Sequence, residues 1–269
     1  MIPKAYITAW RKKAPWQEDF QVEQDLVIER ALMAIYSDEY LKGKLAFRGG
    51  TALHKLYLSP AARYSEDIDL VQITAEPFGP IMDKLREVLS FLGDKPIRKQ
   101  KQHNNTLVYR FDSEDGIPLR LKVEVNCREH HTIFGIQEVK YTMQSEWYTR
   151  EVSIPSYHLT ELLGTKMRAL YQRRKGRDLF DMWYAITQSN VSPKIIIEAW
   201  NFYMKEEGNS ITQKEFLENM EKKIVDQDFL GDMEGLLRPG LSYSIMEAYE
   251  FVKTNLLEKI EEIGKEKYT

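Results

Sequence analysis

The sequence predicts an α+β fold, in which a mixed sheet flanked by helices precedes a helical lobe. Apolar and polar residues alternate with a period of two in several short segments before Pro155, as in half-buried strands. From His158 onward, apolar residues recur almost everywhere at helical spacing. We therefore expect an α/β lobe over residues 1–155 and a helical lobe over residues 156–269.

The α/β lobe is expected to mix strands and helices along the chain. In chain order, we predict a helix over 17–36, a strand over 45–47, a helix over 51–58, a strand at the end of 65–71, a helix over 77–92, and strands over 106–111, 119–127 and 148–154. Asp115 and Gly116 supply the turn between the two strands on either side of them. A strand, a glycine turn and a helix therefore follow one another around Gly49 and Gly50.

The helical lobe contains five predicted helices. They cover 159–174, 177–188, 193–205, 213–225 and 242 to the end of the chain. Ile196, Trp200 and Tyr203 form an apolar stripe on one of these helices, which indicates packing against other elements.

The composition excludes several classes of protein. The apolar share of 43% in 269 residues is ample for a packed core, and the net charge of −3 gives no whole-protein case for nucleic-acid binding. A single cysteine, Cys127, excludes an internal disulfide framework and suits a reducing compartment. No apolar run approaches the roughly 18 residues that span a bilayer, and residues 1–13 do not resemble a secretory signal. We therefore expect a cytoplasmic protein that is not bound to a membrane.

The first chemical signal is the pair Asp67 and Asp69. Residues two apart on a strand point to the same face, so this strand presents two carboxylates together. Neighbouring carboxylates repel each other unless a cation lies between them. Magnesium takes one or two carboxylates together with phosphate oxygens, which favours a nucleotide site. An acidic strand end in contact with water would show the same spacing.

The glycine turn upstream of this pair makes the signal more specific. Gly49 and Gly50 follow a strand and open a helix, which leaves backbone N–H groups free to approach phosphate oxygens. Thr51 can cap that helix and reach a phosphate through its hydroxyl group. The glycine turn and the acidic pair together predict a phosphate-binding turn that faces a metal site.

A third carboxylate lies on the strand over 119–127. Arg120, Lys122, Glu124 and Asn126 share one face of this strand, and apolar residues share the other. Glu124 is expected either to complete the metal site or to act as the base that deprotonates an attacking hydroxyl. An edge strand with one solvated face is the alternative interpretation.

Three segments together resemble the AbiEii/AbiGii toxin family, which are nucleotidyltransferases of the DNA polymerase beta-like superfamily. The string from Phe47 to Leu53, followed by the string from Arg63 to Leu70, resembles the first motif of the family, although Thr51 stands where many superfamily members have serine. Val123-Glu124-Val125 resembles its third-carboxylate motif. Its later basic and acidic motif is similar to Lys166 to Leu170, Arg173, Arg174, and Arg177 to Asp181.

The resemblance implies a nucleotidyltransferase fold and an enzyme that moves a nucleoside monophosphate from an NTP to an acceptor hydroxyl. RNA, particularly the 3′ end of a transfer RNA, is the implied acceptor, and the implied role is that of a toxin in a toxin–antitoxin or abortive-infection system with a cognate antitoxin. Two magnesium ions would be held by Asp67, Asp69 and Glu124, with Lys166 completing the catalytic set. The implied nucleotide contacts are Gly49, Gly50, Thr51, Ser65, Lys166, Arg173, Arg177 and Asp181. The helical lobe would complete the cleft.

Several alternatives stay open at this point. Lys166 and the arginines would also suit a solvated helix face, and Asp178 and Asp181 would also suit helix capping or internal ion pairs. An antibiotic-type nucleotidyltransferase that acts on a small molecule would share the metal site, and a catalytically inactive binding module would share the fold. A nuclease with strand carboxylates would leave the glycine turn unexplained. The densest basic cluster lies between Arg168 and Arg177, where it would attract a polyanion such as transfer RNA.

Overall fold

The computed structural model describes residues 2–101 and 103–260. The chain divides into two compact units. The sheet unit comprises Met1–Tyr157 and Leu236–Pro239, and the helical unit comprises His158–Gly235 and Gly240–Thr269. No sequence signal marks the short return of the chain to the sheet unit.

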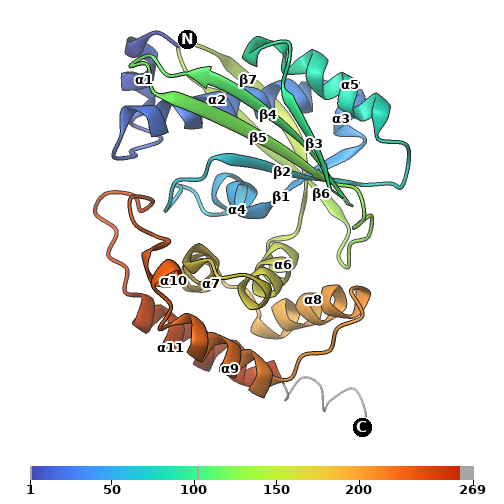
Figure 1. Cartoon of the computed structure of the whole chain (residues 1–269), viewed down its shortest axis with the longest axis vertical. Coiled ribbons are helices and arrows are strands. Elements are labelled where there is room, and N and C mark those ends of the chain that lie inside the picture. The colour runs from blue at the N-terminus through green and yellow to red at the C-terminus, as the bar shows by residue number, and fades with distance from the viewer. Residues whose placement is uncertain (1, 102, 261–269) are drawn as a thin grey trace. The chain divides into compact units, whose positions relative to one another are not determined.

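The sheet unit is built on a seven-stranded mixed sheet (Figure 1), with the strand order β3-β4-β5-β2-β1-β7-β6. Its strands are β1 (Leu45–Arg48), β2 (Asp67–Gln72), β3 (Ile97–Lys101), β4 (Asn104–Asp112), β5 (Pro118–Asn126), β6 (Ile136–Gln144) and β7 (Thr149–Tyr157). The β2–β5 and β1–β7 pairs are parallel, and the other neighbouring pairs are antiparallel. The predicted α+β fold is confirmed, and β3 and β6 are strands that the sequence patterns do not reveal.

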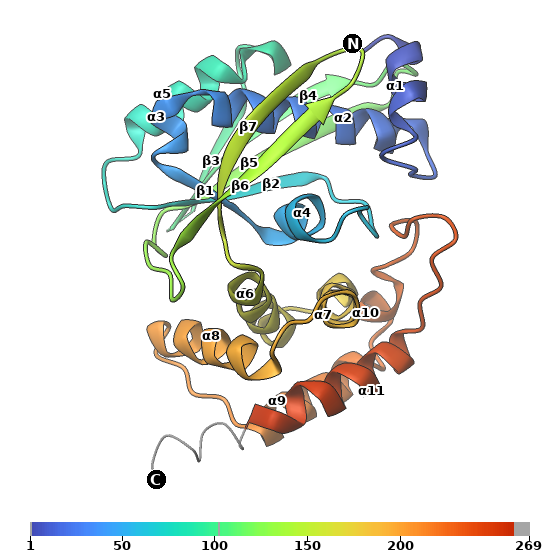
Figure 2. The same ribbon diagram turned by 180° about the vertical axis from the view of Figure 1, so that it is seen from behind.

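Helical segments lie on both faces of this sheet. The helical segments of the sheet unit are α1 (Lys4–Trp10), α2 (Asp19–Ser37), α3 (Glu39–Lys42), α4 (Gly49–Ala52), a π-helical turn over Leu53–Tyr57, α5 (Gly79–Val88) and a 3-10 turn over Ser90–Leu92. Figures 1 and 2 show α2 and α5 on one side of the sheet and α4 on the other. The sequence predicts α2 and α5 because their apolar residues recur on one side, whereas the short α1 has too few residues for such a pattern.

The two central parallel strands have one apolar face and one polar face. Ile68 and Leu70 of β2 are buried in the core, together with Val123 of β5. The intervening residues of both strands are only partly buried. Because side chains alternate across a strand, the core fixes which face the acidic residues occupy.

The helical unit contains α6 (Leu159–Gln172), α7 (Gly176–Gln188), α8 (Pro193–Glu206), α9 (Gln213–Lys223), α10 (Gln227–Gly231), α11 (Ile245–Asn255) and a 3-10 turn over Leu257–Lys259. Gly164 lets α6 approach α8 closely, since a Cβ atom there would lie 2.5 Å from that of Ala199. The buried ammonium group of Lys223 donates hydrogen bonds to the carbonyls of Leu170 and Tyr171 at the end of α6. The last predicted helix ends earlier than expected, at Asn255, and residues 261–269 lie outside the described part of the chain.

Over residues 2–101 and 103–260, none of the helices has both the length and the apolar character that crossing a lipid bilayer requires.

Candidate active site

The acidic pair lies in the middle of the sheet, on β2. Asp67 and Asp69 are two apart on this strand and therefore share its polar face. In the parallel register between β2 and β5, Asp67 is the neighbour of Lys122 and Asp69 is the neighbour of Glu124. The fold thus brings the three predicted carboxylates onto adjacent positions of one sheet face.

Gly49 is the residue that allows the turn to meet this pair. Its φ angle is +81°, which is strained for any residue with a side chain. A Cβ atom at this position would lie 2.3 Å from Oδ2 of Asp69, so the carboxylate occupies the space that only glycine leaves open. The observed position of the Asp69 carboxylate therefore requires glycine at position 49.

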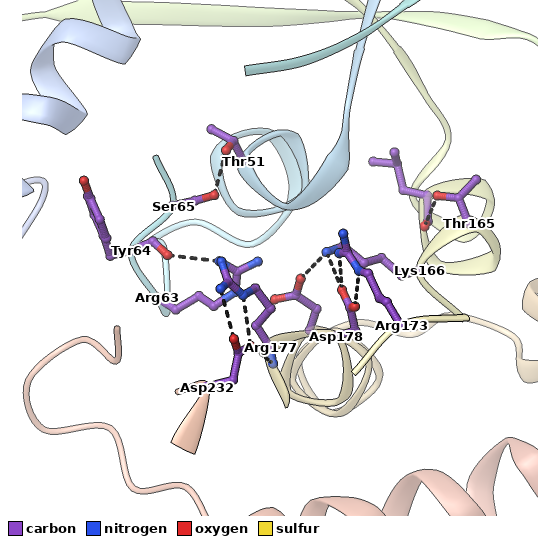
Figure 3. A network of polar contacts seen from close by, with 12 residues as sticks. Thr51, Arg63, Tyr64, Ser65, Thr165, Lys166, Arg173, Arg177, Asp178 and Asp232 are labelled. Atoms are coloured by element: carbon purple, nitrogen blue, oxygen red, sulfur yellow. Dashed lines mark hydrogen bonds and ion pairs between the residues drawn. The ribbon is translucent and has the colours of Figure 1, made fainter. Parts of the chain in front are cut away.

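Thr51 and Ser65 connect the glycine turn to the start of β2 (Figure 3). Their hydroxyl oxygens lie 2.7 Å apart, and the hydroxyl group of Thr51 also donates to the backbone carbonyl of Asp67. Thr51 is buried, with 2% of its surface exposed. Its hydroxyl therefore has a structural partner on β2, and the expected contacts of Thr51 and Ser65 with a nucleotide stay predictions.

The acidic pair carries an electrostatic strain. Burial, and then the charge of Asp69, raises the pKa of Asp67 to about 6. A carboxyl group with such a pKa is stabilised in its charged form by any cation that binds next to it. Two hard oxygen donors on an open polar face, with unfavourable charge in the absence of a cation, match the preferences of magnesium.

Glu124 has polar partners of its own. One carboxylate oxygen lies 2.8 Å from Nζ of Lys122, and the other accepts a hydrogen bond of 3.0 Å from Asn104. Burial lowers the pKa of Lys122, but the hydrogen bond and charge of Glu124 outweigh it and raise the pKa overall. Among the described residues, no three His, Cys, Asp or Glu side chains are grouped as a metal site. The roles of Asp67, Asp69 and Glu124 as metal ligands therefore stay predictions, and in this structure Glu124 is paired with Lys122 and Asn104.

Lys166 on α6, Arg173 after it, and Asp178 and Asp181 on α7 form a network within the helical unit, in which Lys166 and both carboxylates are buried (Figure 3). Nζ of Lys166 lies 3.1 Å from Oδ1 of Asp178 and 2.7 Å from Oδ2 of Asp181. Arg173 donates two hydrogen bonds, of 2.6 and 2.7 Å, to Asp178. Burial raises the pKa of Asp178, but Lys166 and Arg173 outweigh it and lower the pKa overall. The catalytic role of Lys166 and the nucleotide contacts of Arg173 and Asp181 stay predictions.

The rest of the basic cluster on these helices is also paired with carboxylates. Arg177 donates two hydrogen bonds of 3.0 Å to Asp232, and its contact with a nucleotide stays a prediction. The remaining ion pairs are Arg168 with Glu207, Arg174 with Asp226 and Lys175 with Asp232. The cluster is therefore largely neutralised within the helical unit, which the sequence could not reveal because the acidic partners lie 39 to 57 residues away from their basic partners.

A second buried network holds the segment after the glycine turn. Nζ of Lys55 lies 3.0 Å from Asp25 and 2.7 Å from Glu29, two carboxylates of α2. The hydroxyl group of Tyr141 on β6 donates to the same oxygen of Glu29, at 2.6 Å. The network fastens the turn that follows α4 to α2.

Comparison with known proteins agrees with this geometry. The family model described as nucleotidyl transferase AbiEii toxin, type IV TA system, matches residues 30–251. The fold is similar to that of MenT4, a nucleotidyltransferase toxin from Mycobacterium tuberculosis H37Rv, with a TM-score of 0.59, 12% identity, and coverage of 95% of this chain and 88% of that one. It is also similar to JHP933 from Helicobacter pylori, with a TM-score of 0.54, 13% identity, and coverage of 93% and 96%. No curated protein sequence matches the chain.

The two structural similarities establish the fold, and the family model establishes the membership. The matched residues include β1, the glycine turn, both acidic strands and helices α6 and α7. The match covers well over half of the chain, so this protein is a toxin nucleotidyltransferase that belongs to the AbiEii family of type IV toxin–antitoxin systems.

Proposed function

We propose that this toxin transfers a nucleoside monophosphate from an NTP to a hydroxyl group of RNA, with the 3′ end of a transfer RNA as the acceptor, and that the reaction requires magnesium. The observation that carries the proposal is the placement of Asp67 and Asp69 on one sheet face, against Gly49 and beside Glu124. Burial and the charge of Asp69 raise the pKa of Asp67, and a scaffold without metal chemistry gains nothing from this arrangement.

The residues on this face have distinct proposed roles. Asp67, Asp69 and Glu124 would hold magnesium, and two ions would fit the two-metal arrangement known for such transfers. Bound magnesium would neutralise triphosphate charge and make the attacking hydroxyl more acidic. The backbone N–H groups of the turn formed by Gly49 and Gly50 would approach the phosphates, and the Asp69 carboxylate fills the space beside Gly49.

Glu124 can bind magnesium only after it separates from Lys122. The two side chains form an ion pair, so Glu124 joins the site only by exchanging the ammonium group for metal. This exchange would free the ammonium group of Lys122 to neutralise phosphate charge. The proposal therefore includes a rearrangement of one ion pair on substrate binding.

The biological setting is part of the proposal. Family membership supports a cognate antitoxin, encoded nearby, that counteracts the enzyme. NTPs and transfer RNA are cytoplasmic, so we propose that the toxin acts in the cytoplasm.

A labelling experiment tests the proposed reaction. The purified protein is incubated with each labelled NTP, magnesium and total RNA, alongside Asp69→Ala and, as a control on the exposed surface of α5, Asp83→Ala. We expect label in RNA with the wild-type protein and with the control, no label with Asp69→Ala, and no label after chelation of the metal. Equal labelling by Asp69→Ala would refute the metal-site assignment. If the label enters only small molecules, the acceptor is a small molecule and not RNA.

A further inference from the structure

The polar face that carries Asp67 and Asp69 continues across three more strands. In the antiparallel register, Arg110 of β4 is the neighbour of Arg120 on β5. Thr106 of β4 is the neighbour both of Glu124 on β5 and of Lys99 on β3. Since register partners point to the same side of a sheet, these residues lie on the face of the acidic pair.

This face carries an excess of positive charge, and we call it the basic sheet face. It consists of Lys99 and Lys101 on β3, Arg110 on β4, and Arg120 and Lys122 on β5. Two carboxylates of the same three strands share the face, Asp112 and Glu124, so five cations stand against two anions.

Within residues 2–101 and 103–260, four of these cations form no ion pair with a carboxylate. Lys99, Lys101, Arg110 and Arg120 are exposed, and none forms an ion pair with a described residue. Arg110 and Arg120 are directly opposed across β4 and β5, an arrangement of like charges that destabilises a sheet. The densest basic cluster of the sequence is the opposite case, since each of its members has a carboxylate partner within the helical unit.

The strand order places these cations at a distance from the acidic pair that a short stretch of RNA can span. Neighbouring strands lie about 4.8 Å apart, so β3 and β2, which are separated by β4 and β5, lie roughly 14 Å apart. A nucleic-acid strand carries one phosphate per roughly 3.4 Å when its bases are stacked, so this distance corresponds to about four phosphates. A strand that crosses β3, β4 and β5 would bring its end to the acidic pair on β2.

We propose that the basic sheet face binds the phosphate backbone of the acceptor RNA and guides its 3′ end toward Asp67 and Asp69. This inference rests on the proposed transfer to RNA and adds the surface that binds the acceptor. An acidic protein would also be attracted by positive charge, but the acceptor is the polyanion that must reach this face of β2.

Direct binding measurements test the proposal without relying on catalysis. The probe is a short fluorescent single-stranded RNA, and its affinity for the full-length protein is measured by anisotropy from about 50 to 300 mM salt. The test variant is Lys99→Gln/Arg110→Gln/Arg120→Gln. The matched control is Arg98→Gln, because Arg98 is an exposed cation of β3 on the opposite face of the same strand. Thermal unfolding confirms that both variants remain folded.

The triple variant should lose about tenfold to a hundredfold in affinity near physiological salt, and its salt slope should fall by about 2. The control should keep the wild-type affinity and slope. In the transfer reaction, the triple variant should raise the KM for RNA and leave the KM for the NTP unchanged.

Four outcomes would overturn the proposal: no RNA binding by the wild-type protein, wild-type affinity and slope in the triple variant, an equal loss in the control, or equally strong competition by polyglutamate of matched charge. The failure of the proposed function looks different. If the protein binds RNA through this face but transfers no label, the proposed binding surface stands and the proposed reaction is refuted. If the wild-type protein transfers label but the triple variant binds RNA normally, the proposed reaction stands and the proposed RNA-binding surface is refuted.

Discussion

The carboxylate of Asp69 lies where a side chain at position 49 would have to be, so only glycine fits at this position of the candidate site. The positive φ angle of Gly49 turns the chain from β1 into α4, and the missing side chain leaves room for the carboxylate. Gly135 provides a natural comparison, because its φ angle is +80° but a Cβ atom there would have no neighbour within 4 Å.

Gly49→Ala should abolish nucleotidyl transfer and destabilise the protein by more than the roughly 1 kcal/mol expected from backbone strain alone. The added methyl group must displace the carboxylate of Asp69. Gly135→Ala should lose about 1 kcal/mol in the free energy of unfolding and keep its activity. Chemical denaturation and labelled transfer assays on both variants make the comparison. Full activity in Gly49→Ala would show that the position of Asp69 does not matter.

The raised pKa of Asp67 predicts a conflict between stability and activity at a single residue. A carboxyl group whose pKa is raised to about 6 in the folded protein contributes stability that is fully present below pH 4 or so and is lost as the pH rises through 6. At neutral pH the charged side chain therefore costs about 1–3 kcal/mol, with allowance for its partial contact with solvent.

Asp67→Asn should remove this cost. We expect the metal-free variant to be about 1–3 kcal/mol more stable than the wild-type protein near pH 7.5, with the difference disappearing toward pH 4. The same variant should be inactive, because an amide is a poor ligand for magnesium. Denaturant unfolding in the presence of a chelator, measured across this pH range, checks the first expectation, and labelled transfer checks the second. A variant that is less stable than the wild type at neutral pH would contradict the cost of burying the charge of Asp67 beside Asp69.

At the scale of elements, α6 and α7 are joined by a charge network that has a structural consequence. Lys166 is 6% exposed, and it separates the fully buried carboxylates of Asp178 and Asp181. Removing one partner of a buried ion pair leaves an uncompensated charge in the interior. Lys166 therefore stabilises the helical unit, whatever its role in catalysis.

Lys166→Met should lower the free energy of unfolding by about 3–5 kcal/mol. Lys214→Met is the control, because that side chain is 84% exposed on α9, and it should change stability by less than about 0.5 kcal/mol. Calorimetry or denaturant unfolding measures both. If Lys166→Met unfolds like the wild-type protein but no longer transfers label, the lysine acts on the nucleotide and the network is dispensable.

The elements differ in how far the sequence alone could define them. Residues 67–70 of β2 and most of β5 alternate because one face packs in the core, so the face on which their carboxylates lie was predictable. Strand β3 has no buried residue, so no alternation marks it, and the basic sheet face was hidden with it. The acidic pair and its glycine turn are local in sequence. The partners of Arg174 and Arg177 are not, because Asp226 and Asp232 reach them only through the tertiary fold.

At the scale of the whole molecule, the path of the chain links the candidate site to a distant segment. The chain leaves the sheet unit after Tyr157 and returns for Leu236–Pro239. There it forms an isolated antiparallel bridge between Arg63 and Leu237. The amide of Tyr64 donates to the carbonyl of Leu236 at 2.7 Å, and the amide of Arg238 donates to the carbonyl of Ala62 at 3.0 Å. These bonds hold the segment that leads directly into Asp67.

Arg238→Pro tests whether this returning segment supports the site. Proline removes the amide that donates to Ala62, whereas Arg238→Ala keeps it and removes the same arginine side chain. We expect the proline variant to be about 1–3 kcal/mol less stable, to exchange the Tyr64 amide hydrogen faster and to transfer label more slowly, since the chain before Asp67 is less well held. The alanine variant should resemble the wild-type protein in hydrogen exchange. If both variants lose activity equally, the arginine side chain is what matters, and if neither does, the approach to β2 is rigid without the returning segment.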